Sequence, residues 1–167
     1  MKNLKKEPSK NKIETYLSFE LNNEEFGVNV KNVINILEMK KITEVPKSPD
    51  YFKGIINLRG TALPVVDLRI ILGISQLEFT NNTCILVLQL EIDSQEITFG
   101  AIVDSVKEVL KVNLDQIEPA PNLGSKYQSG FIYGMWKIEE NFIMLLDIEN
   151  VLNSEQISVI KEADVTA

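Results

Sequence analysis

The sequence contains no histidine, which removes the commonest general base and the commonest ligand for transition metals. Its single cysteine, Cys84, can form neither an internal disulfide nor a structural zinc site, and it agrees with a reducing compartment. Because Cys84 opens an apolar run, we interpret it as a small buried hydrophobe. The eight glycines are scattered singly and no serine lies in a Gly-x-Ser-x-Gly context, so neither a phosphate loop nor a nucleophile elbow is present.

Long hydrophobic segments are also missing. Apolar runs such as 143–146 fall far short of the ~20 residues that a membrane span needs. No charged-then-apolar segment with a small-residue cleavage site opens the chain, so no secretory signal is visible. We therefore expect a cytoplasmic protein with no direct membrane insertion.

Cations are scarce beyond the start of the chain. Residues 1–12 hold five lysines and one glutamate, a net side-chain charge of +4, so the rest of the chain carries −11 of the total of −7. An acidic body argues against nucleic acid as a partner, because backbone phosphates favour clustered Lys and Arg. The basic start is polar and aperiodic, and we expect residues 1–13 to be a disordered leader.

Short strands dominate the remaining pattern. In the first half we expect strands at 16–21, 25–30, 54–58 and 62–68, with helical turns at 30–37 and 69–73. In the second half we expect strands at 84–90, 96–103, 130–134 and 142–148, with helical turns at 104–110 and 149–152. A pair of prolines separates the strand pairs in each half. Asn153 or Ser154 can cap a C-terminal helix, followed by a tail at 161–167.

The two halves, roughly 14–80 and 81–150, match one another. Phe26-Gly27 corresponds to Phe99-Gly100, and residues 64–68 correspond to 144–148. This indicates an internal duplication with a period of roughly 70 to 75 residues. Many short strands predict a mainly β fold of small barrels or a sandwich. Because even a 60-residue unit buries only about 60% of its surface, we expect the halves to share one hydrophobic core.

Two features carry candidate functions. Asp67 and Asp147 occupy equivalent positions before helical turns, so they are either a symmetric acid pair or two helix N-caps. The acid pair would make the chain a small β-barrel enzyme or a ligand-binding protein with a carboxylate site. Arg59 lies beside Gly60 at a predicted hairpin tip, as either a solvated turn residue or a binding residue with a rigid donor fork.

One stretch carries a specific resemblance. Gly54-Ile-Ile-Asn-Leu-Arg-Gly-Thr-Ala-Leu-Pro-Val-Val-Asp-Leu-Arg69 resembles the central signature of the CheW family, and the likeness extends over residues 14–160. The resemblance implies two five-stranded β-barrels around a common core. It implies a non-catalytic adaptor, without cofactor or metal, that couples chemoreceptors to the histidine kinase CheA. The implied partners are the CheA regulatory domain and the cytoplasmic tip of a receptor, with the adaptor monomeric alone and recruited to membrane-associated receptor arrays.

The resemblance also implies a receptor-binding groove between the barrels. Its expected lining, carried over position by position, is Leu17, Val30, Val33 and Ile36, with Gly100 and Ile102 opposite. Gly54 and Arg59 match family positions tied to receptor coupling. Asn35 is a departure, because relatives often have Glu at this position, and any salt bridge of that Glu is absent here.

Overall fold

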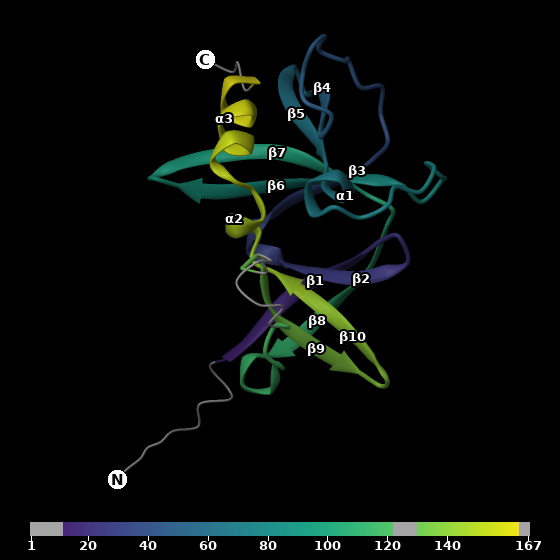
Figure 1. The fold of residues 1–167 in the computed structure, drawn as a ribbon, viewed down its shortest axis with the longest axis vertical. Helices are drawn as coiled ribbons and strands as arrows, with labels where there is room; N and C mark the ends of the chain where they lie inside the picture. The colour runs from purple at the N-terminus through teal and green to yellow at the C-terminus, as the bar shows by residue number, and fades with distance from the viewer. Residues whose placement is uncertain (1–11, 122–129, 164–167) are drawn as a thin grey trace.

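The structure is a computed structural model that describes residues 12–121 and 130–163. In this part of the chain, ten strands form two five-stranded sheets, one above the other in Figure 1. Sheet A has the strand order β8-β1-β2-β10-β9, and sheet B has the order β3-β6-β7-β5-β4. The strands of sheet A are β1 (Ile13–Leu21), β2 (Glu24–Asn29), β8 (Ser105–Asn113), β9 (Ile132–Ile138) and β10 (Asn141–Leu146). The strands of sheet B are β3 (Val33–Glu38), β4 (Phe52–Leu58), β5 (Thr61–Asp67), β6 (Cys84–Ile92) and β7 (Gln95–Val103).

The two sheets do not correspond to the two halves of the sequence. Sheet A joins the first hairpin, β1–β2, to β8, β9 and β10 of the second half, and sheet B joins β3, β4 and β5 to the hairpin β6–β7. The two halves therefore exchange their opening hairpins. In Figure 1 the purple strands accordingly lie among green and yellow ones. Residues 14–80 and 81–150 therefore do not each build one of the two five-stranded sheets.

The exchange is held by one parallel pairing in each sheet. β10 pairs with β2 so that Leu145 lies opposite Gly27, and β5 pairs with β7 so that Val65 lies opposite Gly100. The remaining pairings are antiparallel. These two matching pairs confirm the duplication in structural terms and fix which residues of the two halves are equivalent.

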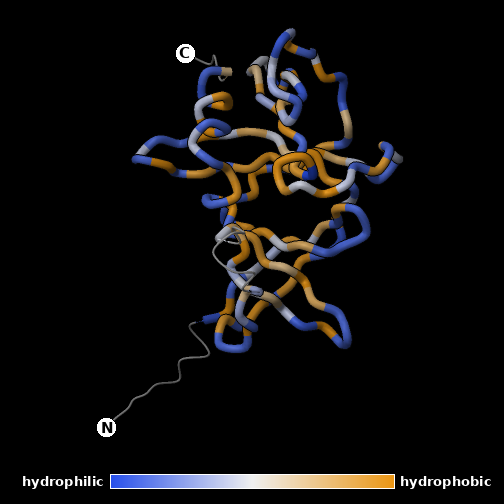
Figure 2. The backbone as a smooth tube through the Cα atoms, viewed as in Figure 1, coloured by the Kyte–Doolittle hydropathy of each residue, from blue (hydrophilic) through white to orange (hydrophobic). Residues whose placement is uncertain are grey.

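One core is shared between the sheets. It includes Phe19 and Phe26 of sheet A, whose rings stack 6.1 Å apart, together with Leu88 and Phe99 of sheet B. Smaller clusters lie within each sheet's curl, around Ile85 in sheet B and Ile143 in sheet A. Figure 2 shows the hydrophobic residues along the strands and the hydrophilic ones at the hairpin ends. The expected shared core is therefore confirmed.

Short helices follow the last strand of each half. Helix α1 (Leu68–Leu72) begins at Asp67, whose side chain accepts from the Arg69 N–H, and ends at Gly73 in the left-handed conformation. Helix α2 (Ile148–Val151) follows β10, and the C-terminal helix is α3 (Ser154–Ala163). Asn153 caps α3: its side chain accepts from the Gln156 N–H, and the Gln156 side chain accepts from the Asn153 N–H.

Two expected helical segments are mostly strand. Residues 30–37 form one 3₁₀ turn, η3 (Val30–Asn32), and then β3, and residues 104–110 fall largely in β8. Residues 30–37 are rich in β-branched residues, and both segments pair with a strand from the other half: β3 with β6 and β8 with β1. Those long-range hydrogen bonds outweigh the helical spacing of the apolar residues.

The ends of the chain lie mainly outside the described residues. The predicted leader, 1–13, overlaps them only at Lys12 and at Ile13, which already begins β1, while α3 continues past the predicted helix end to Ala163. No helix in the described ranges is long and apolar enough to cross a membrane.

Candidate partner-binding surface

The hairpin that joins β4 to β5 presents Arg59 to solvent. Arg59 and Gly60 both have positive φ, 56° and 84°, as a two-residue hairpin turn requires, and the Gly60 N–H donates to the Asn57 side chain at 2.7 Å. Arg59 is exposed. Among the described residues its side chain has no hydrogen bond or ion pair, so its guanidinium is free to bind a partner.

A second element crosses beside this hairpin. The segment 39–44, here called the strap, forms an isolated bridge in which Thr43 and Ile55 exchange two backbone hydrogen bonds of 2.9 Å. Gly54 makes the bridge possible: it has a φ of +137°, and a Cβ there would lie 2.1 Å from the Thr43 carbonyl oxygen. Gly54 is therefore a positioning residue, because it is buried beneath the strap.

Two hollows flank the strap. One, of about 490 Å³, is lined by Met39, Lys40, Ile42, Glu44, Lys53, Phe79 and Ile102. The other, of about 290 Å³, lies between Thr43 and the turn at Gly60. The strap, the hollows and the Arg59 turn form one surface with an apolar floor and several cations at its rim.

The edge of sheet B adds apolar side chains to the molecular surface. β3 is an outermost strand, and its side chains alternate between half-buried and exposed. Ile34 and Ile36 are 52% and 46% exposed. An exposed apolar edge strand is a natural template for association. Asn35 lies between them. Its side-chain oxygen accepts a local hydrogen bond from the Ile36 N–H at 2.8 Å.

The eight predicted groove residues differ in how far their side chains are exposed to solvent. Leu17, Gly100 and Ile102 are buried, and a Cβ at Gly100 would lie 2.7 Å from Ile85. Val30 and Val33 are half-buried against the shared core. Ile36 and Arg59 are exposed, on β3 and on the β4–β5 turn. Of the buried residues, Ile102 lines the larger hollow beside the strap. A receptor site at these eight positions stays a prediction.

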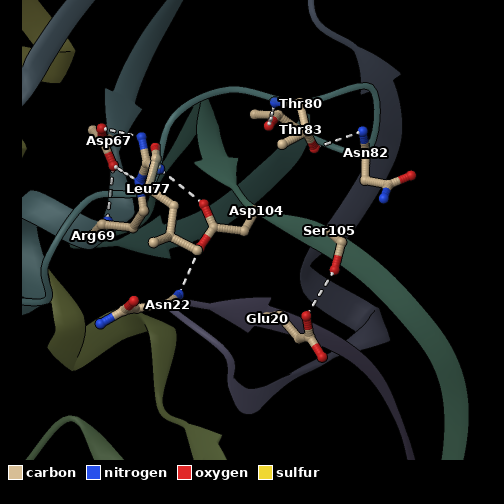
Figure 3. Close-up of polar contacts among 10 residues, drawn as sticks. All are labelled: Glu20, Asn22, Asp67, Arg69, Leu77, Thr80, Asn82, Thr83, Asp104 and Ser105. Atoms are coloured by element: carbon tan, nitrogen blue, oxygen red, sulfur yellow. Dashed lines mark hydrogen bonds and ion pairs between the residues drawn. The ribbon is translucent and has the colours of Figure 1, made fainter.

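A buried ion-pair network joins the two sheets (Figure 3). The Arg69 guanidinium donates to both carboxylate oxygens of Asp67, at 2.9 and 2.8 Å, and to Asp104 at 2.8 Å. Asp104 also accepts from the backbone N–H of Asn22, in the hairpin of sheet A. Arg69 is 1% exposed, and its pKa lies above the usual value, chiefly because of the hydrogen bond to Asp67. Together these bonds hold sheet A against sheet B.

Sequence reasoning missed this network. The sequence shows Arg69 two residues after Asp67, which is a local signal for pairing, but the apolar spacing in 104–110 predicts helix and gives no sign that Asp104 meets Arg69. The exposed side chain of Phe79 lies 5.5 Å from the Arg69 guanidinium, a cation–π distance.

The carboxylate-site alternative is not supported. Asp67 and Asp147 lie at the ends of β5 and β10, in different sheets, and each precedes its own helix. Asp67 is fully buried and bound to Arg69, while Asp147 accepts from the Asn150 side chain at 2.7 Å and makes no N-cap bond. The described ranges contain no group of three His, Cys, Asp or Glu residues placed to hold a metal ion.

Known proteins share this architecture. Residues 15–156 match the family model for the CheW-like domain. The chain belongs to the CheW family. It is 32% identical to the chemotaxis protein CheW of Klebsiella aerogenes, covering 87% of this chain and 85% of that one, and 34% identical to that of Bacillus subtilis, covering 85% and 88%. The crystal structure of the scaffolding protein TtCheW from Thermoanaerobacter tengcongensis superposes with a TM-score of 0.73 at 29% identity, covering 86% of this chain and 96% of that one.

Family membership changes the interpretation of the surface around Arg59. In a CheW-family chain, the exposed Arg59, the strap held by Gly54 and the apolar edge strand β3 become candidates for a protein-binding surface. The larger hollow combines apolar side chains with Lys40, Lys53 and Glu44, a mixture that suits contact with another protein.

Proposed function

We propose that this chain is a chemotaxis adaptor that couples chemoreceptors to the histidine kinase CheA. The observation that carries the proposal is membership of the CheW family across residues 15–156, because its curated relatives are named chemotaxis proteins and TtCheW is described as a scaffolding protein. The proposed partners are the regulatory domain of CheA and the helical cytoplasmic tip of a receptor. The adaptor is cytoplasmic, monomeric alone, and recruited to membrane-associated receptor arrays.

The proposed receptor site is the surface around the strap. Val30, Val33 and Ile36 would supply apolar contacts and Arg59 a charged one, with Leu17, Gly100 and Ile102 packed behind them. Apolar anchors at helical spacing commonly dock in grooves of this kind. Arg59 at the rim would fix the register of the helix, since an arginine fork pairs geometrically with carboxylates.

The Asp67–Arg69–Asp104 network supports a scaffold role. A scaffold transmits a partner's position only if its own parts keep a fixed relation, and these bonds tie the β1–β2 hairpin of sheet A to helix α1 beside sheet B. The open edges β3 and β8 lie on different sheets, so a receptor and a kinase domain can bind without competing for one strand.

The test is reconstitution from purified parts. The full chain is mixed with CheA and a receptor cytoplasmic fragment from the same organism, and complex formation is followed by size-exclusion chromatography while phosphate incorporation into CheA is followed in parallel. We expect a ternary complex in which kinase activity depends on the adaptor. Failure of the folded chain to bind either protein would reject the proposal.

A further inference from the structure

The duplication lets the two halves be compared residue by residue. Val65 pairs with Gly100 in sheet B as Leu145 pairs with Gly27 in sheet A. Counting onward from these pairs along each strand, Asp67 is equivalent to Asp147 and Arg69 to Glu149. On the partner strands, Asp104 is equivalent to Lys31.

The charges at these equivalent positions are rearranged. In sheet B the Asp67 carboxylate holds the Arg69 guanidinium through two hydrogen bonds, and both side chains are 1% exposed. In sheet A, Glu149 stands where the arginine would be, so this half provides no guanidinium for Asp147. Lys31 is exposed and forms no ion pair among the described residues.

A cavity lies beside Asp147 and Glu149. It measures about 240 Å³, many times the ~15 Å³ that a single water needs. Its lining includes Asp147 and Glu149, together with Glu14, Tyr16 and Tyr133; it also includes Asn29, Lys31, Asn32, Leu114, Leu146 and Ile148. The cavity lining thus carries three carboxylates against one amine. Burial raises the pKa of Tyr16 to about 12, and the nearby Glu14, Tyr133 and Asp147 contribute in the same direction.

We propose that this cavity binds an arginine side chain of a partner protein, with its guanidinium on the Asp147 carboxylate as the Arg69 guanidinium lies on Asp67. The equivalent carboxylate in the other half already shows the ligand and its two-bond geometry. A planar fork matches a carboxylate better than the point charge of a lysine does. Tyr16 and Tyr133 also line the cavity, and aromatic rings attract cations. None of the strap residues 39–44 lines this cavity, whereas Val30 of the proposed receptor surface adjoins Asn29 and Lys31 of its lining.

The experiment uses the full chain and two neutral-backbone probes, Nα-acetyl-arginine amide and its uncharged isostere, Nα-acetyl-citrulline amide. Binding is followed by NMR chemical shifts of Tyr16, Tyr133 and Asp147. We expect the arginine probe to bind and the citrulline probe to bind at least about tenfold more weakly, because the charge-assisted bonds are lost. Equal binding of the two probes, or no binding of the arginine probe, overturns the proposal.

Four variants, one of them a control, locate the site. Glu149→Arg places the guanidinium within the chain, so it should abolish probe binding and raise the melting temperature. Asp147→Asn should lower the affinity for the arginine probe about tenfold or more. Glu140→Arg makes the same charge change at an exposed hairpin turn and is the matched control. It should alter neither the binding of the arginine probe nor the melting temperature. If Glu149→Arg leaves probe binding intact, the cavity is not the site. If the unmodified chain does not bind the arginine probe but Lys31→Ala does, then Lys31 already neutralises Asp147, and the proposal is wrong.

Discussion

Gly54 lies directly beneath the carbonyl oxygen of Thr43, so close that any Cβ at position 54 would stand 2.1 Å from that oxygen. The second half repeats the arrangement at Gly134, where a Cβ would stand 2.2 Å from the Ile117 side chain and 3.0 Å from the Glu118 carbonyl oxygen. Each glycine therefore lets an irregular segment bridge the outer strand of its sheet. The contact explains why position 54 requires glycine without any direct contact between Gly54 and a partner.

Gly54→Ala should displace the strap. The backbone oxygen of Thr43 cannot yield as a flexible side chain can, and the positive φ adds strain of about 1–3 kcal/mol. We expect a lower melting temperature and weaker receptor binding. Gly134→Ala disturbs the equivalent segment of sheet A and should lower stability while sparing receptor binding. Gly130→Ala, with nothing within 4 Å of the added Cβ, should change neither. Equal loss of receptor binding in the Gly54 and Gly134 variants would contradict the role of the strap.

The equivalent aspartates should differ in their contribution to stability. Asp67→Ala leaves the Arg69 guanidinium buried without its main partner, which typically costs about 3–5 kcal/mol. Asp147→Ala removes one half-exposed carboxylate bonded to Asn150, which should cost about 1 kcal/mol or less. Urea denaturation of both variants measures the difference. Similar losses for the two would mean that the Asp67–Arg69 pair contributes no more than a surface contact.

Arg59→Ala should impair coupling and leave the fold intact. Arg59 is exposed, and such substitutions usually change the free energy of unfolding by less than about 0.5 kcal/mol. A desolvated interface arginine can contribute ~2 kcal/mol or more to binding, roughly thirtyfold in affinity. The variant is compared with Lys137→Ala, which removes an exposed cation from β9 of sheet A.

Leu68→Ala should show the opposite behaviour. Leu68 is 1% exposed in the shared core, so its truncation should cost about 2–5 kcal/mol of stability. Thermal melts and receptor-dependent kinase assays are run on all three variants. Normal receptor-dependent kinase control with Arg59→Ala would show that Arg59 is only a solvated turn residue. If Arg59→Ala is unfolded, the turn depends on the arginine side chain.

The hairpin exchange predicts that neither half folds alone. In residues 14–80, four of the five strands lose a pairing partner from the second half: β1 loses β8, β2 loses β10, β3 loses β6 and β5 loses β7. We expect this fragment to be unfolded or aggregated by circular dichroism. The full chain should unfold in a single transition, as small bodies with one core do. Two separate transitions in calorimetry would show that the sheets are independent.

The sequence alone determined the features that depend on neighbouring residues. Turn residues placed both opening hairpins, and the pair Asp67 and Gly73 bounded a short helix that the structure confirms. The repeat of Phe26-Gly27 at Phe99-Gly100 revealed the duplication, and the stretch 54–69 identified the family.

Only the tertiary structure decided which strands pair and which charges meet. The helical spacing in 30–37 and 104–110 was a true local pattern, but strands β6 and β1 supply backbone hydrogen bonds that no local conformation could match. Likewise, no sequence pattern places Asp104 of one half on Arg69 of the other, or a cavity beside Asp147. Some pairing partners lie more than a whole repeat apart along the chain, as Phe26 and Met144 do. Their choice therefore rests on the shared core and on backbone bonds that form only when both halves have folded together.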